Sequence, residues 1–173
     1  MSNISVYLAG SIRDGVEEDF LWRERAITEL RGEWPRNARS RCTILSPLAG
    51  KSYNAETKQW TIYQKYVPDS KYIVHADYWC VDRADIGLFD FRSLATGYAS
   101  IGTVSEWGRS TVRSMLRLAT VAPNQQGSNA MFGLHPFLEQ HATKVFTDID
   151  DMIEFAKEYI DAVTISPQCR ISQ

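Results

Sequence analysis

The chain has 173 residues, and its apolar fraction of 44% and charged fraction of 23% are typical of a folded globular protein, which excludes a disordered, collagen-like or coiled-coil chain. Its 19 Lys and Arg residues against 21 Asp and Glu residues leave a net charge of -2, which argues against a nucleic-acid partner. No apolar run approaches the ~18 residues of a membrane span, and the N-terminus lacks a signal-peptide pattern. We therefore expect a single cytoplasmic domain over residues 1–173 with no membrane partner.

The cysteines and histidines give no sign of a metal site. Cys42, Cys80 and Cys169 are far apart and form no Cys-x-x-Cys pattern, so neither a disulfide framework nor a zinc site is expected. The three histidines show no metal-ligand spacing. We expect no metal and no cofactor.

The first half of the chain alternates between strand and helix patterns. Residues 4–9 (ISVYLA) predict a buried strand. A helix follows, with Asp14 as its N-cap and Gly32 as its end, because apolar residues recur at near-helical spacing (Phe20, Ile27, Leu30). Residues 42–46 (CTILS) predict a second strand, and residues 48–68, rich in Tyr, Lys and Gln, predict a loop with a short helix.

The same alternation continues in the second half. A helix is predicted to begin at Asp69 or Ser70, and residues 85–91 (DIGLFDF) predict a third strand. After a loop rich in Gly and Ser, the next helix is predicted to run from Thr103 to about Met115.

Two further strands and a helix complete the chain. Residues 116–122 predict the fourth strand, residues 123–133 a polar loop, and residues 144–147 a short fifth strand. A final amphipathic helix is predicted by apolar residues at helical spacing, namely Ile149, Met152, Ile153, Ala156, Ile160 and Val163.

The order β-α-β-α-β-α-β-β-α predicts an α/β protein with helices on both faces of a parallel sheet. We predict a single flavodoxin-like (Rossmann-like) domain with five strands in the order 2-1-3-4-5. In such a sheet, ligands bind outside the carboxyl ends of the strands, where the strand order reverses. The loops over residues 10–15, 92–103 and 123–135 leave those ends, which locates the expected site.

The loop Gly10-Ser11-Ile12-Arg13 follows the first strand and opens a helix. Backbone N–H groups at a helix N-terminus favour an anion, and Ser11 and Arg13 add a hydroxyl and a bidentate donor suited to phosphate. The alternative is an ordinary turn that uses Gly10 for its backbone freedom. The loop matches neither GxGxxG nor a Walker motif, so no dinucleotide or nucleoside triphosphate is indicated.

Asp77 is a charged residue on the side of a predicted helix that should otherwise be apolar. By helical spacing it shares the sheet-facing side of its helix with Ile73, Cys80, Val81 and Ala84. Partial burial there raises a carboxyl pKa and suits proton transfer. The alternative is a rotated helix that leaves Asp77 in solvent.

Glu106 and Tyr7 are the other candidate catalytic residues. Glu106 lies near the predicted switch point, and in the first turn of a helix the dipole would hold it ionised, as a nucleophile requires. The alternative is a capping box from Thr103 to Glu106. Tyr7 either orients Glu106 by a hydrogen bond or packs in the core.

In this order the residues resemble the nucleoside 2-deoxyribosyltransferase family, whose fold is also a flavodoxin-like five-stranded sheet. The resemblance runs from about residue 5 to 160, and Gly102-Thr103-Val104-Ser105-Glu106-Trp107-Gly108 is similar to the family's Gly-Thr-x-x-Glu-φ-Gly nucleophile segment, φ being apolar. The other matching pieces are Val6-Tyr7-Leu8-Ala9-Gly10-Ser11 and Asp77 followed by Ala84-Asp85-Ile86.

The resemblance implies a role for each residue. Glu106 would attack C1′ of a 2′-deoxyribosyl group, Tyr7 would orient it, and Asp77 would assist proton transfer at the departing base. The sugar would then pass to another nucleobase. Substrate binding is expected at Gly10, Ser11, Ile12, Arg13, Asp85, Ser100, Gly102 and Asn129.

Two departures leave the substrate open. Ser100 stands where base-exchanging members often have an aspartate, and Gly10-Ser11-Ile12-Arg13 also resembles the loop that holds the phosphate in deoxynucleoside 5′-monophosphate N-hydrolases. Asn129 instead matches a position from which a neighbouring subunit contacts the 5′ end of the sugar in the transferases.

We therefore expect a transferase acting on a small nucleoside or nucleotide and a free nucleobase. The alternatives are a 5′-monophosphate N-hydrolase that releases free base, and a nucleotide-binding protein without activity. The resemblance also implies a homo-oligomer with a shared active site.

Overall fold

The computed structural model describes residues 4–13, 16–31, 42–48, 51–54, 57, 59–62, 70–98, 100–123 and 136–165. The expected helix limits Asp14, Gly32 and Asp69 and most of the polar loop over residues 123–133 lie outside this part of the chain. None of the described helices is both long enough and apolar enough to cross a bilayer.

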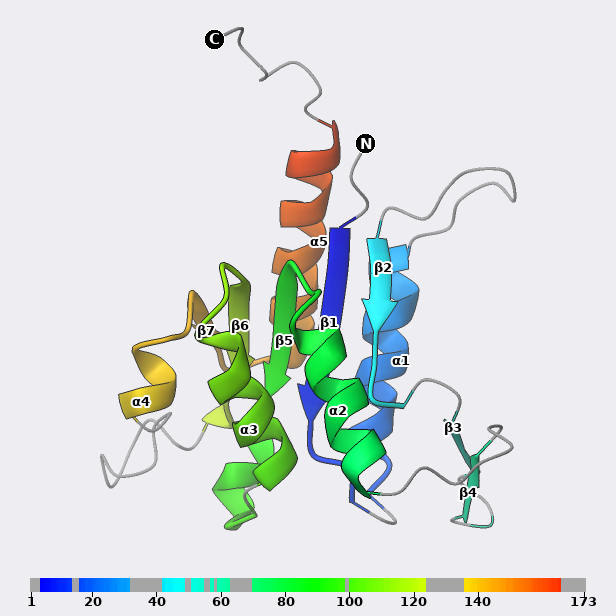
Figure 1. The fold of residues 1–173 in the computed structure, drawn as a ribbon. Coiled ribbons are helices and arrows are strands. Elements are labelled where there is room, and N and C mark those ends of the chain that lie inside the picture. The colour runs from blue at the N-terminus through cyan, green and yellow to red at the C-terminus, as the bar shows by residue number, and fades with distance from the viewer. Residues whose placement is uncertain are drawn as a thin grey trace, which may run out of the picture.

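One five-stranded parallel sheet organises the described chain (Figure 1). Its strands occur in the order β2-β1-β5-β6-β7, which confirms the predicted order 2-1-3-4-5 of the main strands. All four pairings are parallel, with Val6 opposite both Ile44 and Ile86. The strands are β1 (Ile4–Gly10), β2 (Cys42–Leu45), β5 (Ile86–Asp90), β6 (Leu116–Thr120) and β7 (Lys144–Phe146).

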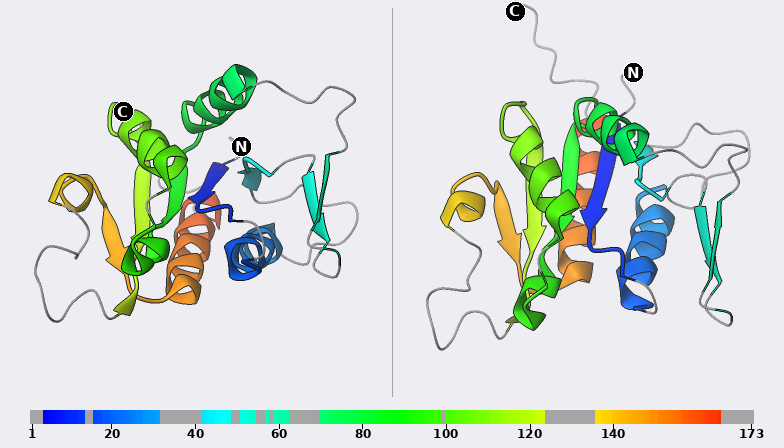
Figure 2. Two further views of the ribbon diagram at one scale, coloured as in Figure 1. Left: turned by 90° about the horizontal axis from the view of Figure 1, so that it is seen from below. Right: turned by 60° about the horizontal axis from the view of Figure 1, so that its bottom comes forward.

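Helices cover both faces of this sheet, as predicted (Figure 2). The first and last helices, α1 (Glu18–Arg31) and α5 (Ile149–Ile165), pack together on one face. The other face carries α2 (Ser70–Val81) and α3 (Ile101–Ser110). The short helices η1 (Arg92–Thr96) and α4 (Pro136–Glu139) follow β5 and β6 in the chain.

Strand β1 divides its side chains between two hydrophobic layers. Val6 and Leu8 pack in the layer under α1 and α5, whereas Tyr7 and Ala9 pack in the layer under α2 and α3. Successive side chains of a strand point to opposite faces, and a central parallel strand is covered on both. This alternation places Tyr7 on the same side of the sheet as Asp77 and Glu106.

Two predicted elements were wrong. The described residues within 48–68 include an antiparallel hairpin of β3 (Lys51–Asn54) and β4 (Gln59–Ile62), where a loop with a short helix was expected. The aromatic and β-branched residues of these strands favour extended backbone. Helix α3 begins at Ile101 and ends at Ser110, so it starts earlier and stops earlier than the predicted span from Thr103 to Met115.

Candidate active site

Helices α2 and α3 bring Asp77 and Glu106 together above β1. The two helices are joined at neighbouring residues, where the Tyr78 and Ser105 hydroxyls share a short hydrogen bond. One turn further, Arg109 donates two hydrogen bonds to the Asp82 carboxylate, at 2.8 and 2.6 Å. These contacts hold the two helices side by side, as Figure 1 also shows.

Glu106 lies in the second turn of α3, not at its start. The Ser100 hydroxyl caps this helix by accepting hydrogen bonds from the Thr103 N–H at 3.3 Å and the Thr103 hydroxyl at 3.0 Å. The alternative reading of a capping box from Thr103 to Glu106 was therefore wrong. The expectation that a first-turn position holds Glu106 ionised was also wrong, because the first turn contains no acidic residue.

The environment of Glu106 favours its neutral form. The side chain is almost completely buried, and burial together with the charge of Asp77 raises its pKa to about 7. The Tyr7 hydroxyl and the Arg23 guanidinium act in the opposite direction and lower that pKa. Near neutral pH, the site therefore holds a carboxyl group that can be either a proton donor or an anion.

Tyr7 is completely buried directly beside this carboxyl. Its pKa is raised strongly by burial and by the charges of Glu106 and Asp77, so the phenol stays neutral and keeps a proton to donate. Its hydroxyl makes no well-formed hydrogen bond within the described residues. Tyr7 thus packs in the core and also presents an unused donor close to Glu106.

Asp77 is half-buried on α2, and its charge acts on Glu106, Tyr7 and Cys80. This excludes the alternative in which a rotated helix leaves Asp77 wholly in solvent. The predicted sheet-facing side of α2 is only partly correct, however, because Val81 is buried whereas Ile73 is 37% exposed.

The side chains of Ser11 and Arg13, which were expected to bind phosphate, form contacts within the protein. The Ser11 and Ser93 hydroxyls share a buried hydrogen bond of 2.6 Å, which joins the ends of β1 and β5. Arg13 forms a bidentate ion pair with Asp19, at 2.8 and 2.7 Å, and the Asp19 carboxylate also accepts the Arg13 backbone N–H. Ile12 is 37% exposed beside them. The Arg13 side chain that was expected to bind phosphate is thus paired within the protein.

The other residues that were predicted to bind substrate are considered one by one. Asp85 lies at the amino end of β5, away from the expected edge of the sheet, and its carboxylate accepts two 2.8 Å hydrogen bonds from Ser5. Ser100 and Gly102 lie at the N-terminus of α3, on the expected edge. Asn129 lies outside the described residues.

Sequence reasoning missed Arg23, which is completely buried on α1 beneath the first loop. A signal was available, because Arg23 falls at helical spacing between Phe20 and Ile27, on the apolar side of the predicted helix. A charged residue at such a position requires partners inside the protein.

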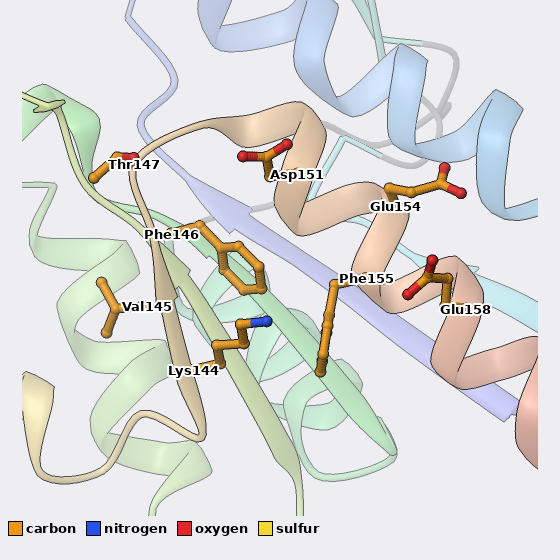
Figure 3. Close-up of a pocket in the computed structure, with 8 residues that line it drawn as sticks. All are labelled: Lys144, Val145, Phe146, Thr147, Asp151, Glu154, Phe155 and Glu158. Atoms are coloured by element: carbon orange, nitrogen blue, oxygen red, sulfur yellow. The ribbon is translucent and has the colours of Figure 1, made fainter.

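A separate hollow of about 530 Å³ lies beside the edge strand β7 (Figure 3). The Lys144 ammonium lies over the ring of Phe155, 4.1 Å from its centre, and the acidic side chains of α5 line the rim. None of the three candidate catalytic residues lines this hollow. Within the described chain, no cluster of His, Cys, Asp and Glu side chains is suited to hold a metal ion.

Comparison with known proteins establishes the fold. A conserved protein from Enterococcus faecalis V583 has a similar crystal structure, with a TM-score of 0.62 and 16% identity, covering 91% of this chain and 99% of that chain. A CMP N-glycosidase from Clostridium botulinum is similar with a TM-score of 0.53 and 12% identity, covering 90% and 98%. No protein-family model matches the sequence, and no curated protein matches it.

Proposed function

We propose that this protein cleaves the N-glycosidic bond of a nucleoside or nucleotide, with Glu106 as the nucleophile. The observation that carries the proposal is the cluster of two carboxyl groups and a buried phenol from three different elements, Glu106, Asp77 and Tyr7. The enzymatic activity of the CMP N-glycosidase with a similar fold supports the same class of reaction.

The two carboxyl groups supply the acid and the anion that such a reaction needs. Burial and the charge of Asp77 raise the pKa of Glu106 to about 7, so that about half of this carboxyl group is ionised at neutral pH. An ionised Glu106 oxygen bonds to C1′ while the C1′–N bond breaks and its electron pair passes to the base. Asp77 transfers a proton from water to the departing base nitrogen, and the Tyr7 hydroxyl steadies the Glu106 carboxylate before attack.

The resulting glycosyl–Glu106 ester then has two fates. A nitrogen of a second nucleobase attacks C1′ while the C1′–O bond to Glu106 breaks, and the proton of that nitrogen passes through Asp77 to water. This regenerates the Glu106 carboxylate and completes a transfer. Attack by water at the same carbon, with one proton of that water passing through Asp77 to the solvent, completes a hydrolysis. Exclusion of water from the site decides between them. On the resemblance of the segment from Gly102 to Gly108, we propose transfer of a 2′-deoxyribosyl group between bases.

Hydrolysis of a nucleoside 5′-monophosphate is the second candidate. It is favoured by the substrate in the name of the CMP N-glycosidase and by the serines at the expected edge of the sheet. In the Ser11–Ser93 pair, one hydroxyl donates to the other, so one proton of the pair is unused and can be donated to a phosphate oxygen.

A substrate panel tests the proposal and separates these candidates. The purified protein is incubated with deoxynucleosides, ribonucleosides and their 5′-monophosphates, with and without an acceptor base, and the products are separated by chromatography. Transfer gives a new nucleoside only with acceptor, whereas hydrolysis releases base without it. A Glu106→Gln variant with unchanged turnover would exclude the nucleophile role. Ligand recovered intact, with no base released by any substrate, would support the binding-protein alternative.

A further inference from the structure

Arg13 and Asp19 form a closed arrangement where the first loop enters α1. The buried Asp19 carboxylate accepts two hydrogen bonds from the Arg13 guanidinium, at 2.8 and 2.7 Å, and a third from the Arg13 backbone N–H at 2.9 Å. A phosphate bound at a helix N-terminus uses the same two kinds of donor, a backbone N–H and a guanidinium. The carboxylate of Asp19 therefore occupies the donors that a bound anion would need.

Other donors around this loop are also used within the protein. The backbone N–H groups of Asp19 and Phe20 donate to the carbonyls three residues earlier, at 3.1 and 2.9 Å. Arg23 is completely buried beneath the loop, where its guanidinium donates to the Gly10 and Ser11 carbonyls at 2.8 and 3.2 Å. These groups stabilise the turn itself instead of facing a ligand.

The loop after β5 has the same arrangement as the loop after β1. The buried Asp90 carboxylate accepts the Arg92 backbone N–H at 3.0 Å and two hydrogen bonds from the Arg92 guanidinium, both at 2.9 Å. Glu18 is a second acidic neighbour of Arg92, at 3.4 Å. In both loops at this edge of the sheet, an arginine that could bind an anion is thus neutralised by a carboxylate of the same chain.

The Arg13–Asp19 pair lies between the first loop and the segment that leads to Glu106. The Arg13 guanidinium lies 5.4 Å from the centre of the Tyr98 ring. Tyr98 precedes the start of α3 by three residues, and its backbone N–H donates to the Ser93 carbonyl at 3.2 Å. A charged group of a substrate that faces the first loop therefore meets a guanidinium already paired with a carboxylate.

A 5′-phosphate would bring a charge of about -2 to these balanced pairs. Taking Arg13 away from Asp19 would leave a buried carboxylate without its partner, which is costly. The Ser11–Ser93 pair has one hydroxyl proton to donate but no positive charge. An uncharged 5′-hydroxyl group needs no counter-charge, and one hydroxyl proton is sufficient for it.

We propose that Asp19 is a specificity-determining residue, which closes the first loop to phosphate and restricts the substrate to nucleosides with an uncharged 5′ group. The choice among substrates rests on the proposed function and distinguishes its two candidates. The closure of the loop to anions does not rest on it, and can be measured with inorganic phosphate alone.

Three substrates test the proposal on the unmodified protein, namely a 2′-deoxynucleoside, its 5′-monophosphate and its 5′-O-sulfamoyl derivative, whose added group is neutral and similar in size to phosphate. The kcat/KM of the monophosphate should be at least about ten-fold below that of the nucleoside, and the sulfamoyl derivative should be closer to the nucleoside. A monophosphate as reactive as the nucleoside would overturn the proposal. A sulfamoyl derivative as poor as the monophosphate would do so too, since size would then explain the preference.

Asp19→Asn tests the residue itself, because it keeps the size of the side chain and an oxygen acceptor but removes the charge. The ratio of kcat/KM for the monophosphate to that for the nucleoside should rise at least about ten-fold. Asp19→Glu keeps the charge and should leave this ratio near that of the unmodified protein. A purely structural role would lower both activities equally and would overturn the proposal. The comparison of three substrates needs no variant, so it applies even if Asp19→Asn does not fold.

Asp82→Asn is the matched control. It releases Arg109 from an equally close bidentate pair, at 2.8 and 2.6 Å, between α2 and α3 and not in the two loops. The ratio for the two substrates should change by less than about two-fold. A change as large as that of Asp19→Asn would mean that any released guanidinium produces the effect, and would overturn the proposal.

Titration with inorganic phosphate, followed by NMR of the backbone amides, tests the closed loop without any substrate. Asp19→Asn should bind phosphate at least about ten-fold more tightly than the unmodified protein and Asp82→Asn do. Equal affinity in all three proteins would overturn the proposal. Tighter binding by Asp19→Asn, when the unmodified protein cleaves none of the substrates, would retain the closed loop and reject the proposed function.

Discussion

Glu106 combines two properties that oppose each other, since a nucleophile must be ionised and a buried carboxyl resists ionisation. Burial and Asp77 raise its pKa, whereas Tyr7 and Arg23 lower it. The balance near pH 7 is suited to a group that must alternate between an ester, an anion and an acid. The ionisation of this residue depends on three other side chains, each from a different element.

The pH dependence of activity follows from this balance. Because only the ionised carboxylate attacks, kcat/KM should rise with pH and reach half its maximum near the Glu106 pKa of about 7. Glu106→Gln should reduce kcat about a thousand-fold or more. A profile of initial rates from pH 5 to 9 checks both, and an acidic limb centred near pH 4.5 would contradict the assigned environment.

The substitution Tyr7→Phe tests whether the Tyr7 hydroxyl acts on Glu106. Loss of the hydroxyl should reduce kcat about ten-fold to a hundred-fold and move the acidic limb to higher pH, because Tyr7 lowers the Glu106 pKa. Stability should change little, since this buried hydroxyl makes no well-formed hydrogen bond in the described chain. Rate profiles and urea unfolding measure the two effects, and a large loss of stability at full activity would reverse the assignment.

At the scale of elements, the N-terminus of α3 positions Glu106, the proposed nucleophile. Ser100 caps it through its hydroxyl, so Glu106 lies one turn and a half further along, facing Tyr7 and Asp77. The same hydroxyl was a candidate ligand for phosphate. It accepts two hydrogen bonds from Thr103 and still has its own proton to donate, so capping and ligand binding are compatible.

Two substitutions separate capping from ligand binding at Ser100. Ser100→Ala should cost about 1 kcal/mol of unfolding free energy because the cap is lost. Ser100→Asp should preserve stability, since aspartate is also a good N-cap, but its charge should weaken a 5′-monophosphate more than a nucleoside. Urea unfolding and the ratio of KM values for the two substrates provide the readouts. Equal effects on both substrates would remove Ser100 from phosphate binding.

At the scale of the whole molecule, the raised pKa of Glu106 has a cost in stability. Burial raises this pKa from 4.5 to about 7, so the folded protein keeps a proton that the unfolded chain releases between these values. The stability that this carboxyl contributes is present below pH 4.5 and is lost as pH rises through 7.

Glu106→Gln should remove this dependence. Its unfolding free energy relative to the unmodified protein should increase by about 1–3 kcal/mol between pH 4.5 and pH 8. Thermal or urea unfolding at both pH values measures the change, and no activity is needed. A difference that stays constant with pH would mean that Glu106 is not desolvated in the folded protein.

The strand order could be predicted from the sequence, whereas the catalytic roles of Tyr7, Asp77 and Glu106 stay a prediction. Apolar runs separated by helical patterns leave few arrangements for a parallel sheet, because crossovers are right-handed and the central strands need cover on both faces. The side of the sheet on which Tyr7 lies follows from the period of the strand. The turn of α3 that carries Glu106 was predicted incorrectly, because the helix begins at Ile101 with Ser100 as its N-cap. The hairpin of β3 and β4 could not be predicted, since Tyr53 and Trp60 belong to short strands in a polar segment.

Only the tertiary structure decided how the polar groups are paired. Arg13 binds Asp19 instead of lying free for a phosphate, and Asp85 binds Ser5. Arg23 lies under Gly10 and has no carboxylate partner among the residues that the structure describes. A pattern of apolar positions determines which face is buried, but several partners compete for each charge within one fold. Distances of a few ångströms and the local loss of water decide that competition, and both arise only when the helices are packed on the sheet.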